Sequence, residues 1–473
     1  MWGLRLCYPI LAGTMRVKEQ RVFGTFGARF CGVALFCSLA APVSAQPLAP
    51  AEDPEKKSSE IRGSSALPWP DKLEPIEYRS PEEGAVLRFN LASQTLFRFD
   101  HVEGGNGERR DEYDIDFRRI RIAVQGAFFK DRLRTRLQVN AGVEAGESVE
   151  LLDAWLEAKI MPYMLLRAGQ FITPFTYFRT LSFRIQQLPD WPITTRFFGA
   201  ERQIGVMLHD GRPTDEDESD NPLSYAIGVF TGQNARASHN VGITEVYGDT
   251  PANPSSFRDY QLPDELHPEV FVRLAHHTRD LYDPRQSMDL ESLSDVKKGK
   301  VRHTLALSAA VDAGPRETLD TSMRLAPEFV LKARGWTLIA IAYLAWYDPV
   351  RALSTRLAFY GSMTELAWRA NRWWGLAARY AFVGYSRSVR NDARFYAQER
   401  LATAEDESTR AELGQQYAEA GLTRAQHEAS LGLNVYLIED NLKLQTDISS
   451  LHTYRSDADR NDWRVRTQLQ VAF

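Results

Sequence analysis

Arginine side chains recur at every second position in several segments of the chain. Within residues 132–141, Arg134 and Arg136 alternate with Leu133, Thr135 and Leu137. Such alternation places the arginines on one face of a strand and the apolar residues on the other. A row of guanidinium groups that lines an aqueous passage attracts anions, whereas on an ordinary solvated wall the charges form ion pairs between neighbouring strands. The sequence leaves both interpretations open for each arginine.

Patterns for other chemistry are weak. The chain contains neither G-x-S-x-G nor H-E-x-x-H, and it has no P-loop. His276 and His277 are adjacent, so on a strand they point to opposite faces and cannot readily share a metal ion. The acidic run at 215–218 is typical of a solvated turn. We therefore predict no enzyme activity, no catalytic residue, no metal site and no cofactor.

The composition excludes several classes of protein. The 473 residues include 57 Lys and Arg against 62 Asp and Glu, a balance that argues against nucleic-acid binding. Mean hydropathy is −0.37, and no run of 18 apolar residues follows residue 45, so a helical membrane protein is excluded. Membrane β-barrels fit the same totals, because only every second residue of their strands faces lipid.

The N-terminus has the layout of a secretory signal peptide. Residues 1–45 contain all three cysteines, a basic stretch, an apolar run over 30–41 and the small-x-small site Val43-Ser44-Ala45. They hold five basic residues and one acidic residue, so their removal leaves 52 basic against 61 acidic residues and a net charge of −9. Residues 46–83 are rich in Pro, Glu, Ser and Lys and are predicted to be flexible.

Residues 84–473 are predicted to form one domain of alternating strands. Most segments are close to the ~9–11 residues that a tilted strand needs to cross a bilayer. Sixteen segments alternate: 86–99, 114–126, 132–141, 149–160, 163–171, 203–209, 223–231, 268–277, 301–311, 322–333, 336–347, 359–369, 373–385, 427–437, 441–451 and 461–473.

The connections favour a barrel over a soluble β-sandwich. Long connections (172–202, 232–267, 386–426) follow odd-numbered segments, and most even-numbered segments are followed by tight turns. Residues 278–300 break this rule, which indicates an insertion or a miscounted strand. A helix-like stretch spans 399–419. Phe473 ends the chain on an apolar face, as in the assembly signal of bacterial outer-membrane barrels. We predict an all-β, 16-stranded antiparallel transmembrane β-barrel in the bacterial outer membrane.

In a barrel the arginines of the strands are expected to point into the lumen, because an arginine facing lipid at mid-membrane costs about 2–4 kcal/mol. The connection after the fifth segment, 172–202, is the third one after an odd-numbered segment and carries seven aromatic residues, so we expect this third connection to fold into the lumen and narrow it. Its arginines are predicted to line the constriction: Arg179, Arg184, Arg196 and Arg202. The predicted lumen-facing residues are Arg88, Arg98, Arg134, Arg136, Arg167, Arg273, Arg369, Arg379, Arg464 and Arg466.

Several stretches resemble the phosphate-selective porin O and P family. They are Arg118-Arg119-Ile120-Arg121 with Gln125-Gly126, Leu152-Asp153-Ala154-Trp155-Leu156, Gly169-Gln170-Phe171 with Thr173-Pro174-Phe175, and Glu201-Arg202-Gln203-Ile204-Gly205-Val206. The resemblance covers about 85–473 and is strongest over 114–210. It implies passive uptake of small, anionic solutes such as phosphate, assembly as a homotrimer, and insertion by the barrel-assembly machinery.

The chain also departs from this family. Ile172 stands where members often carry Lys, the order Glu201-Arg202 is often reversed, and lysine is scarce after the signal peptide. A general or differently selective porin therefore fits the sequence as well as a phosphate channel does. The alternative function is a plugged or structural outer-membrane barrel, receptor-like and without general pore activity.

Overall fold

A computed structural model of the chain describes residues 76–80, 84–103, 109–142, 149–199, 202–210, 222–232, 268–278, 301–312, 321–348, 356–403 and 422–473, together with positions 407, 410 and 414. The predicted signal peptide 1–45 and most of the predicted flexible segment 46–83 lie outside these residues. Among the described residues, no helix is both long and apolar enough to cross a membrane.

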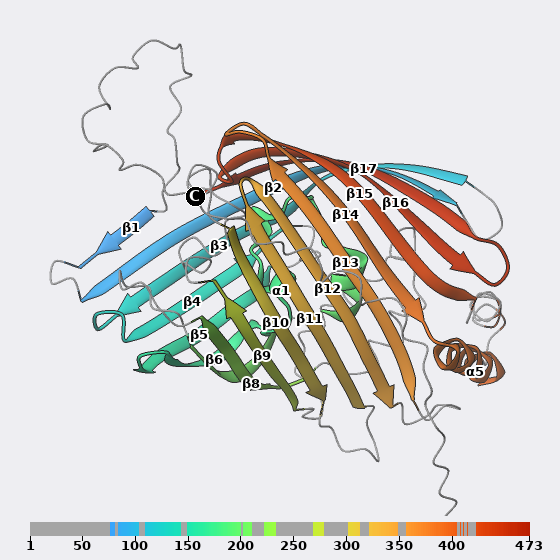
Figure 1. The fold of residues 1–473 in the computed structure, drawn as a ribbon, viewed down its shortest axis with the longest axis horizontal. Coiled ribbons are helices and arrows are strands. Elements are labelled where there is room, and N and C mark those ends of the chain that lie inside the picture. Colours follow the sequence, from blue (N-terminus) through green and yellow to red (C-terminus); the bar gives the residue numbers. More distant parts are fainter. Residues whose placement is uncertain are drawn as a thin grey trace, which may run out of the picture. The chain divides into compact units, whose positions relative to one another are not determined.

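Sixteen strands, β2 to β17, close into one antiparallel barrel (Figure 1). Each strand pairs with its neighbours in sequence, and β17 pairs with β2 through contacts such as Trp463 with His101. Their bounds are β2 Ala85–Glu103, β3 Arg109–Phe128, β4 Leu133–Asn140, β5 Glu150–Met161, β6 Met164–Ile172, β7 Arg202–His209, β8 Leu223–Phe230, β9 Glu269–His277, β10 Val301–Asp312, β11 Thr321–Ala333, β12 Trp336–Asp348, β13 Leu357–Arg369, β14 Trp374–Tyr385, β15 Thr423–Ile438, β16 Leu442–Arg455 and β17 Arg460–Ala472.

The sixteen predicted strands are confirmed, each at its predicted place. β9 and β10 pair directly with each other, so no further strand lies between them in the described barrel; positions 279–300 lie outside the described residues. β2 and β3 are longer than predicted because they pair with each other as far as Glu103 and Arg109.

Alternation explains the strands well in most of the barrel. On β16, Leu444 and Ile448 are exposed on the outer face, whereas Lys443, Gln445 and Asp447 are buried on the inner face. A polar inner face can be buried because a connection of the same chain packs against it inside the barrel.

β12 differs, because both of its faces are apolar. Its inner face carries Ile339, Ile341 and Tyr343, which are at most 2% exposed. They pack in one hydrophobic cluster with Phe175 and Phe198 of the third connection. The inner wall here is apolar because it meets an apolar partner in place of water.

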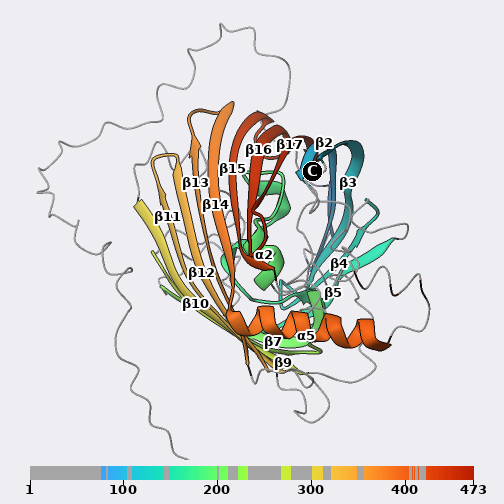
Figure 2. The ribbon, with the colours of Figure 1, turned by 90° about the vertical axis from the view of Figure 1, so that its right-hand side faces the viewer.

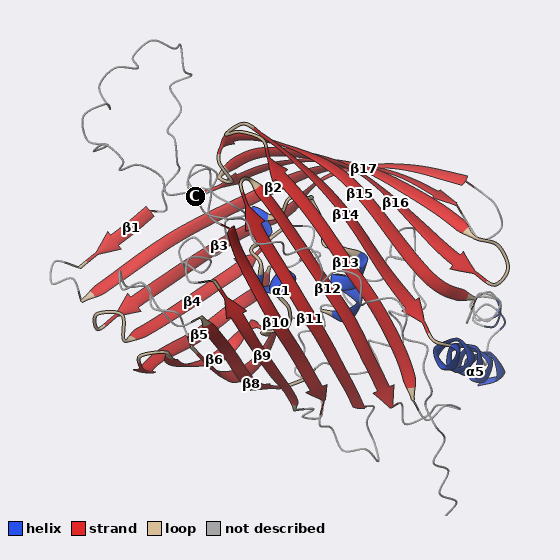
Figure 3. Cartoon of the chain, in the orientation of Figure 1, coloured by secondary structure: helices blue, strands red, loops and turns tan. Residues whose placement is uncertain are grey.

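The third connection, residues 173–199, lies inside the ring of strands (Figure 2). It contains α1 (Tyr177–Thr180), a short 3-10 helix η3 (Phe183–Ile185) and α2 (Ile193–Phe198). Helices are few in the described chain (Figure 3). The longest, α5 (Arg387–Thr403), begins earlier than the predicted helix at 399–419, because Ser386 caps it by accepting a hydrogen bond from the Val389 amide.

A further short strand, β1 (Ile76–Arg79), lies within the segment predicted to be flexible, so that prediction is wrong at these four residues. β17 ends where Phe473 exchanges backbone hydrogen bonds with Leu91, which leaves the edge of β2 at Val86–Phe89 open. β1 pairs with this edge, and Glu77 accepts a hydrogen bond from Arg88 (2.6 Å). Unfilled strand edges readily take up another strand.

Candidate functional site

The third connection is fastened to the inner wall through its own backbone. Side chains of the wall donate to a succession of its carbonyl oxygens: Gln470 to Arg184 (3.0 Å), Gln445 to Gln186 (2.8 Å), Asn434 to Gln187 (2.9 Å), Arg118 to Pro189 (3.1 Å), Arg379 to Asp190 (2.8 Å) and Arg324 to Phe198 (3.2 Å). Glu428 in turn accepts from the Ile193 amide (2.8 Å). These contacts hold the connection across the lumen, from β11 round to β3.

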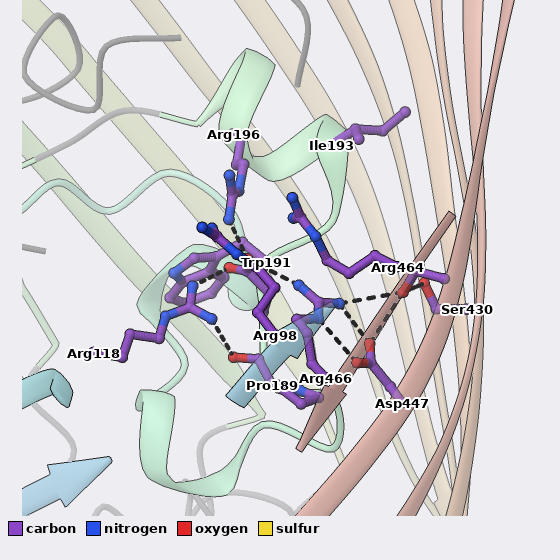
Figure 4. Close-up of polar contacts among 12 residues, drawn as sticks. Arg98, Arg118, Pro189, Trp191, Ile193, Arg196, Ser430, Asp447, Arg464 and Arg466 are labelled. Atoms are coloured by element: carbon purple, nitrogen blue, oxygen red, sulfur yellow. Dashed lines mark hydrogen bonds and ion pairs between the residues drawn. The ribbon is translucent and has the colours of Figure 1, made fainter. Parts of the chain in front are cut away.

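Asp190 is the electrostatic centre of this attachment. Its carboxylate contacts Arg118 of β3 (2.5 Å), Arg466 of β17 (3.0 Å) and Arg196 of α2. Figure 4 shows the three guanidinium groups converging from separate elements. Arg466 also binds Asp447 (2.9 Å), and the amide of Trp191 donates to Asp190 (2.7 Å). Asp190 was not among the predicted site residues, because one aspartate in an aromatic loop has no periodic pattern.

The charge of Asp190 depends on these arginines. Burial alone would raise the pKa of its carboxyl, but Arg118, Arg196 and Arg466 outweigh burial and hold the pKa well below the usual range for aspartate. Asp190 is therefore ionised under all ordinary conditions. A carboxylate that binds three guanidinium groups and is 4% exposed is a firm anchor for the loop.

A β-bulge brings Arg118 to this anchor. Gln94 of β2 pairs with Arg119, and the next residue of β2 pairs with Phe117, so Arg118 is the extra residue. Adjacent strand residues ordinarily point to opposite faces, but the bulge allows Arg118 and Arg119 both to face the lumen. Strict alternation cannot predict this, and neither residue was among the predicted lumen-facing arginines.

A belt of amide side chains continues around the same level of the wall. Gln468 donates to Gln445 (3.0 Å), which donates to Asn434 (2.7 Å). On the neighbouring strands Gln94 donates to Gln470 (2.7 Å) and accepts from Arg119 (2.8 Å). Amides both donate and accept, so members of the belt bind one another and the loop at the same time.

Two glycines of the wall leave room for apolar side chains of the loop. A Cβ atom on Gly361 of β13 would lie 2.7 Å from the ring of Phe198, and one on Gly432 of β15 would lie 2.3 Å from Leu188. Phe198 also stacks on Tyr343 of β12, with ring centroids 5.0 Å apart. These close contacts fix the position of the loop against β12–β15.

The third connection does not cover the inner face of β4–β7 in the same way, so the side chains there are more exposed. Here Arg134, Arg136 and Arg167 have side chains that are 18%, 30% and 24% exposed, although they lie on the inner face. Under the loop, Arg379 and Arg466 are 0% and 2% exposed. We call the set Arg134, Arg136, Arg167 and Arg202 with Asp153 and Glu157 the basic arc.

Carboxylates in the basic arc are shared. Asp153 contacts Arg136 (3.3 Å) and Arg202 (2.8 Å). Glu157 contacts Arg134 (3.5 Å) and Arg167 (2.8 Å), and it also contacts His209 (2.9 Å). Including Asp131 of the preceding turn, which accepts from Arg134 (2.6 Å), three carboxylates among the described residues contact the four arginines. The basic arc therefore carries excess positive charge beside water.

Arg167 is held in a fixed orientation within the arc. Its guanidinium lies over the Trp155 ring, 4.3 Å from the centroid, and Glu157 accepts from its Nε and Nη2. Stacking on an aromatic face and a two-point hydrogen bond leave the remaining edge of the guanidinium directed away from both partners.

The other predicted lumen-facing arginines are also held by partners. Arg88 binds Glu77 (2.6 Å), Arg98 binds Asp114 (3.1 Å), Arg273 binds Glu328 (3.3 Å), Arg379 binds Glu428 (2.8 Å), Arg464 binds Asp100, and Arg369 stacks on the Tyr436 ring (4.2 Å). For most of these arginines the contacts fit the interpretation in which the charges form ion pairs along the wall, and not the one in which they attract anions.

The four arginines predicted to line the constriction lie in different environments, from buried to partly exposed. Arg179 is buried beside Trp191, whose ring centroid is 5.3 Å away. Arg196 binds Asp190 and is 36% exposed. Arg202 is the first residue of β7, outside the loop where it was predicted, and binds Asp153. Arg184 lies in η3, near Arg136 and Lys443.

Comparison with known proteins agrees with this architecture. Residues 89–216 match the sequence model of the family described as phosphate-selective porin O and P. The chain is an outer-membrane porin. The match runs from β2 past β7, so it contains the third connection and the whole basic arc. No curated protein matches the sequence.

Solved structures share the fold of the porin at low sequence identity. The outer membrane channel DcaP of Acinetobacter baumannii is 10% identical, with a TM-score of 0.50 over 84% of this chain and 99% of that one. An anion-selective porin from Comamonas acidovorans is 9% identical, with a TM-score of 0.50 over 82% and 100%. Pseudomonas putida OprB is 10% identical, with a TM-score of 0.51 over 83% and 95%.

Proposed function

We propose that this porin is a passive channel for small hydrophilic solutes that prefers anions, and that it is not an enzyme. The basic arc carries the proposal. Its arginines remain in contact with water inside the barrel, and they outnumber the carboxylates that they bind. Excess positive charge along a narrow aqueous path attracts anions and repels cations.

The third connection is proposed to set the size of the passage. It packs against the wall from β9 round to β3, where wall and loop arginines such as Arg379 and Arg179 are buried. The route we infer runs between the loop and β4–β7. The alternative, a plugged barrel, is disfavoured by the exposure of Arg136 and Arg167 on the inner face of these strands.

Small oxyanions such as phosphate are the solute class we propose. The Nη1 side of the Arg167 guanidinium has a fixed orientation and no hydrogen-bond partner among the described residues, which suits a planar or tetrahedral oxyanion better than a spherical ion. We also propose assembly as a homotrimer, which the family resemblance implies, and insertion by the barrel-assembly machinery, with Phe473 at the closing strand as the recognised end.

Planar-bilayer recording tests the proposal. Purified porin should give stable conductance steps, and in a KCl gradient the reversal potential should show that chloride passes more readily than potassium. Phosphate should compete with the chloride current. A silent protein would refute the channel and favour the plugged barrel, and a cation preference would refute the role of the basic arc.

Variants of the arc sharpen the test. A unit charge at contact distance contributes about 1 kcal/mol in water, so Arg136→Gln or Arg167→Gln should lower the anion-to-cation permeability ratio by up to about fivefold. Arg372→Gln is the matched control, because this substitution removes the same charge at an exposed turn between β13 and β14. An equal effect of all three substitutions would contradict the proposal.

A further inference from the structure

A second group of polar side chains lies at the turn end of β13, β15 and β16, on other strands than those of the basic arc. Arg369 is the last residue of β13, and its guanidinium stacks on the ring of Tyr436 at 4.2 Å. Its Nε and Nη2 atoms are both buried, and neither has a hydrogen-bond partner among the described residues. Buried charged donors without acceptors are unfavourable, so such a pair is rarely left empty.

Gln186 of the loop adds two more unpartnered polar atoms. Its side chain is buried, and both Nε2 and Oε1 lack hydrogen-bond partners among the described residues. The backbone oxygen of Gln186 accepts from Lys443 (3.1 Å), while the hydroxyl of Tyr436 donates to the neighbouring Gln187 (2.8 Å). Tyr436 and Lys443 therefore join Arg369 and Gln186 into one region beneath the loop.

This region has excess positive charge. The Lys443 side chain is fully buried and contacts one carboxylate, Asp440 (3.1 Å). Arg369 and Arg184 are both close enough to Lys443 to act on it electrostatically. Among the described residues, the cations Arg369 and Lys443 thus lie near one carboxylate, that of Asp440, and a small anion would offset the excess.

We propose that a small tetrahedral oxyanion binds beneath the loop, between Arg369, Gln186 and Lys443. The Nε–Nη2 edge of a guanidinium matches two oxygens of such an anion, and the Gln186 amide and the Lys443 ammonium supply donors for further oxygens. A carboxylate has too few oxygens for these donors. The Oε1 atom of Gln186 is an acceptor, which favours an anion that carries a hydroxyl, such as hydrogenphosphate, over sulfate.

The bound anion would fasten the loop. It would connect Gln186 in the loop to Arg369 in the wall, next to the contacts of Lys443 and Gln445 with the Gln186 carbonyl. This is a holding site behind the loop and not a step on the permeation route. The proposal of this site does not depend on the anion preference proposed for the basic arc, and each can be refuted without the other.

Hydrogen–deuterium exchange of the loop in the purified porin is the test, with sodium phosphate, sulfate and chloride compared at equal ionic strength. When phosphate is at about ten times its dissociation constant, amides of residues 183–191 should exchange about tenfold more slowly than in chloride. Sulfate should protect less. Equal exchange in phosphate and chloride would overturn the proposal.

Two variants locate the site. Arg369→Lys keeps the charge but loses the two-point edge, so it should abolish the protection by phosphate. Gln186→Met keeps the size of the side chain without its polar atoms and should weaken the protection, which keeps the test decisive if Arg369→Lys does not fold. Arg136→Gln in the basic arc is the matched control: it should alter ion selectivity and keep full protection. Protection that survives both Arg369→Lys and Gln186→Met would refute the site.

Discussion

The substitution Asp190→Asn tests how the third connection is held inside the barrel. It keeps the shape of the side chain and removes the negative charge that Arg118, Arg196 and Arg466 share. The amide of Asn can still accept from the Trp191 backbone, so the change acts mainly on the ion pairs.

The expected cost follows from burial. Removing one partner of a buried ion pair costs about 3–5 kcal/mol. Two features place Asp190 near the lower end: Arg466 keeps its contact with Asp447, and Arg196 is 36% exposed, so water can solvate it. A cost of about 3 kcal/mol corresponds to a roughly hundredfold shift in the equilibrium between the docked and the released loop.

Hydrogen–deuterium exchange measures this equilibrium directly, because loop amides such as that of Ile193 exchange when the loop opens. In D190N, peptides that cover 176–199 should exchange about a hundredfold faster, while peptides of β16 and β17 stay protected. Asp457→Asn is the control, since Asp457 pairs with Arg455 in an exposed turn, where such a pair contributes about 0–1 kcal/mol. Equal exchange of the loop in D190N and D457N would refute Asp190 as the anchor.

Two further predictions concern the same loop. The pKa of Asp190 in the folded protein is held well below that of a free aspartate, about 3.9, so its stabilisation of the docked loop is complete above about pH 4 and is lost as the pH falls towards the folded-state pKa. Hydrogen exchange of the loop amides, corrected for the intrinsic rate, should therefore be constant from pH 8 to 5 and rise below 4. Faster loop exchange on raising the pH would contradict this sign. Gly432→Val should push Leu188 away from β15, at an overpacking cost of about 1–3 kcal/mol. The displaced loop should change the single-channel conductance, and adding Leu188→Ala should restore the original conductance. Failure of that rescue would mean that the steric contact between residues 432 and 188 is not the cause.

The strands were predictable because most of them obey a local rule. A strand between lipid and a polar interior must alternate, and alternation can be read within about ten residues of sequence. β16 and β17 show the rule clearly, with Leu444 and Leu469 outside and Gln445 and Gln468 inside. The count of sixteen was correct for the same reason, even where 278–300 broke the pattern of short turns.

The contacts of the site were not predictable, because they join residues far apart in the chain. Asp190 meets Arg118 and Arg466, which lie 72 and 276 positions away. The bulge at Arg118 and the apolar inner face of β12 arise from pairing and packing with other segments. Likewise, the sequence could place Arg379 and Arg136 in the lumen but could not distinguish which of them the loop covers.

Coverage by the loop decides which charges act on a solute, and this would explain how an acidic chain forms the anion-preferring passage that we propose. On β13–β17 the loop covers charges of both signs, such as Arg379, Glu428 and Asp447, while it leaves the basic arc exposed to water. A loop released from this wall would no longer confine solutes to the basic arc. Release should therefore widen the channel and weaken its anion preference together, so D190N should show both changes in the same recording. A wider channel that kept its full selectivity would mean that confinement beside the basic arc does not set the anion preference.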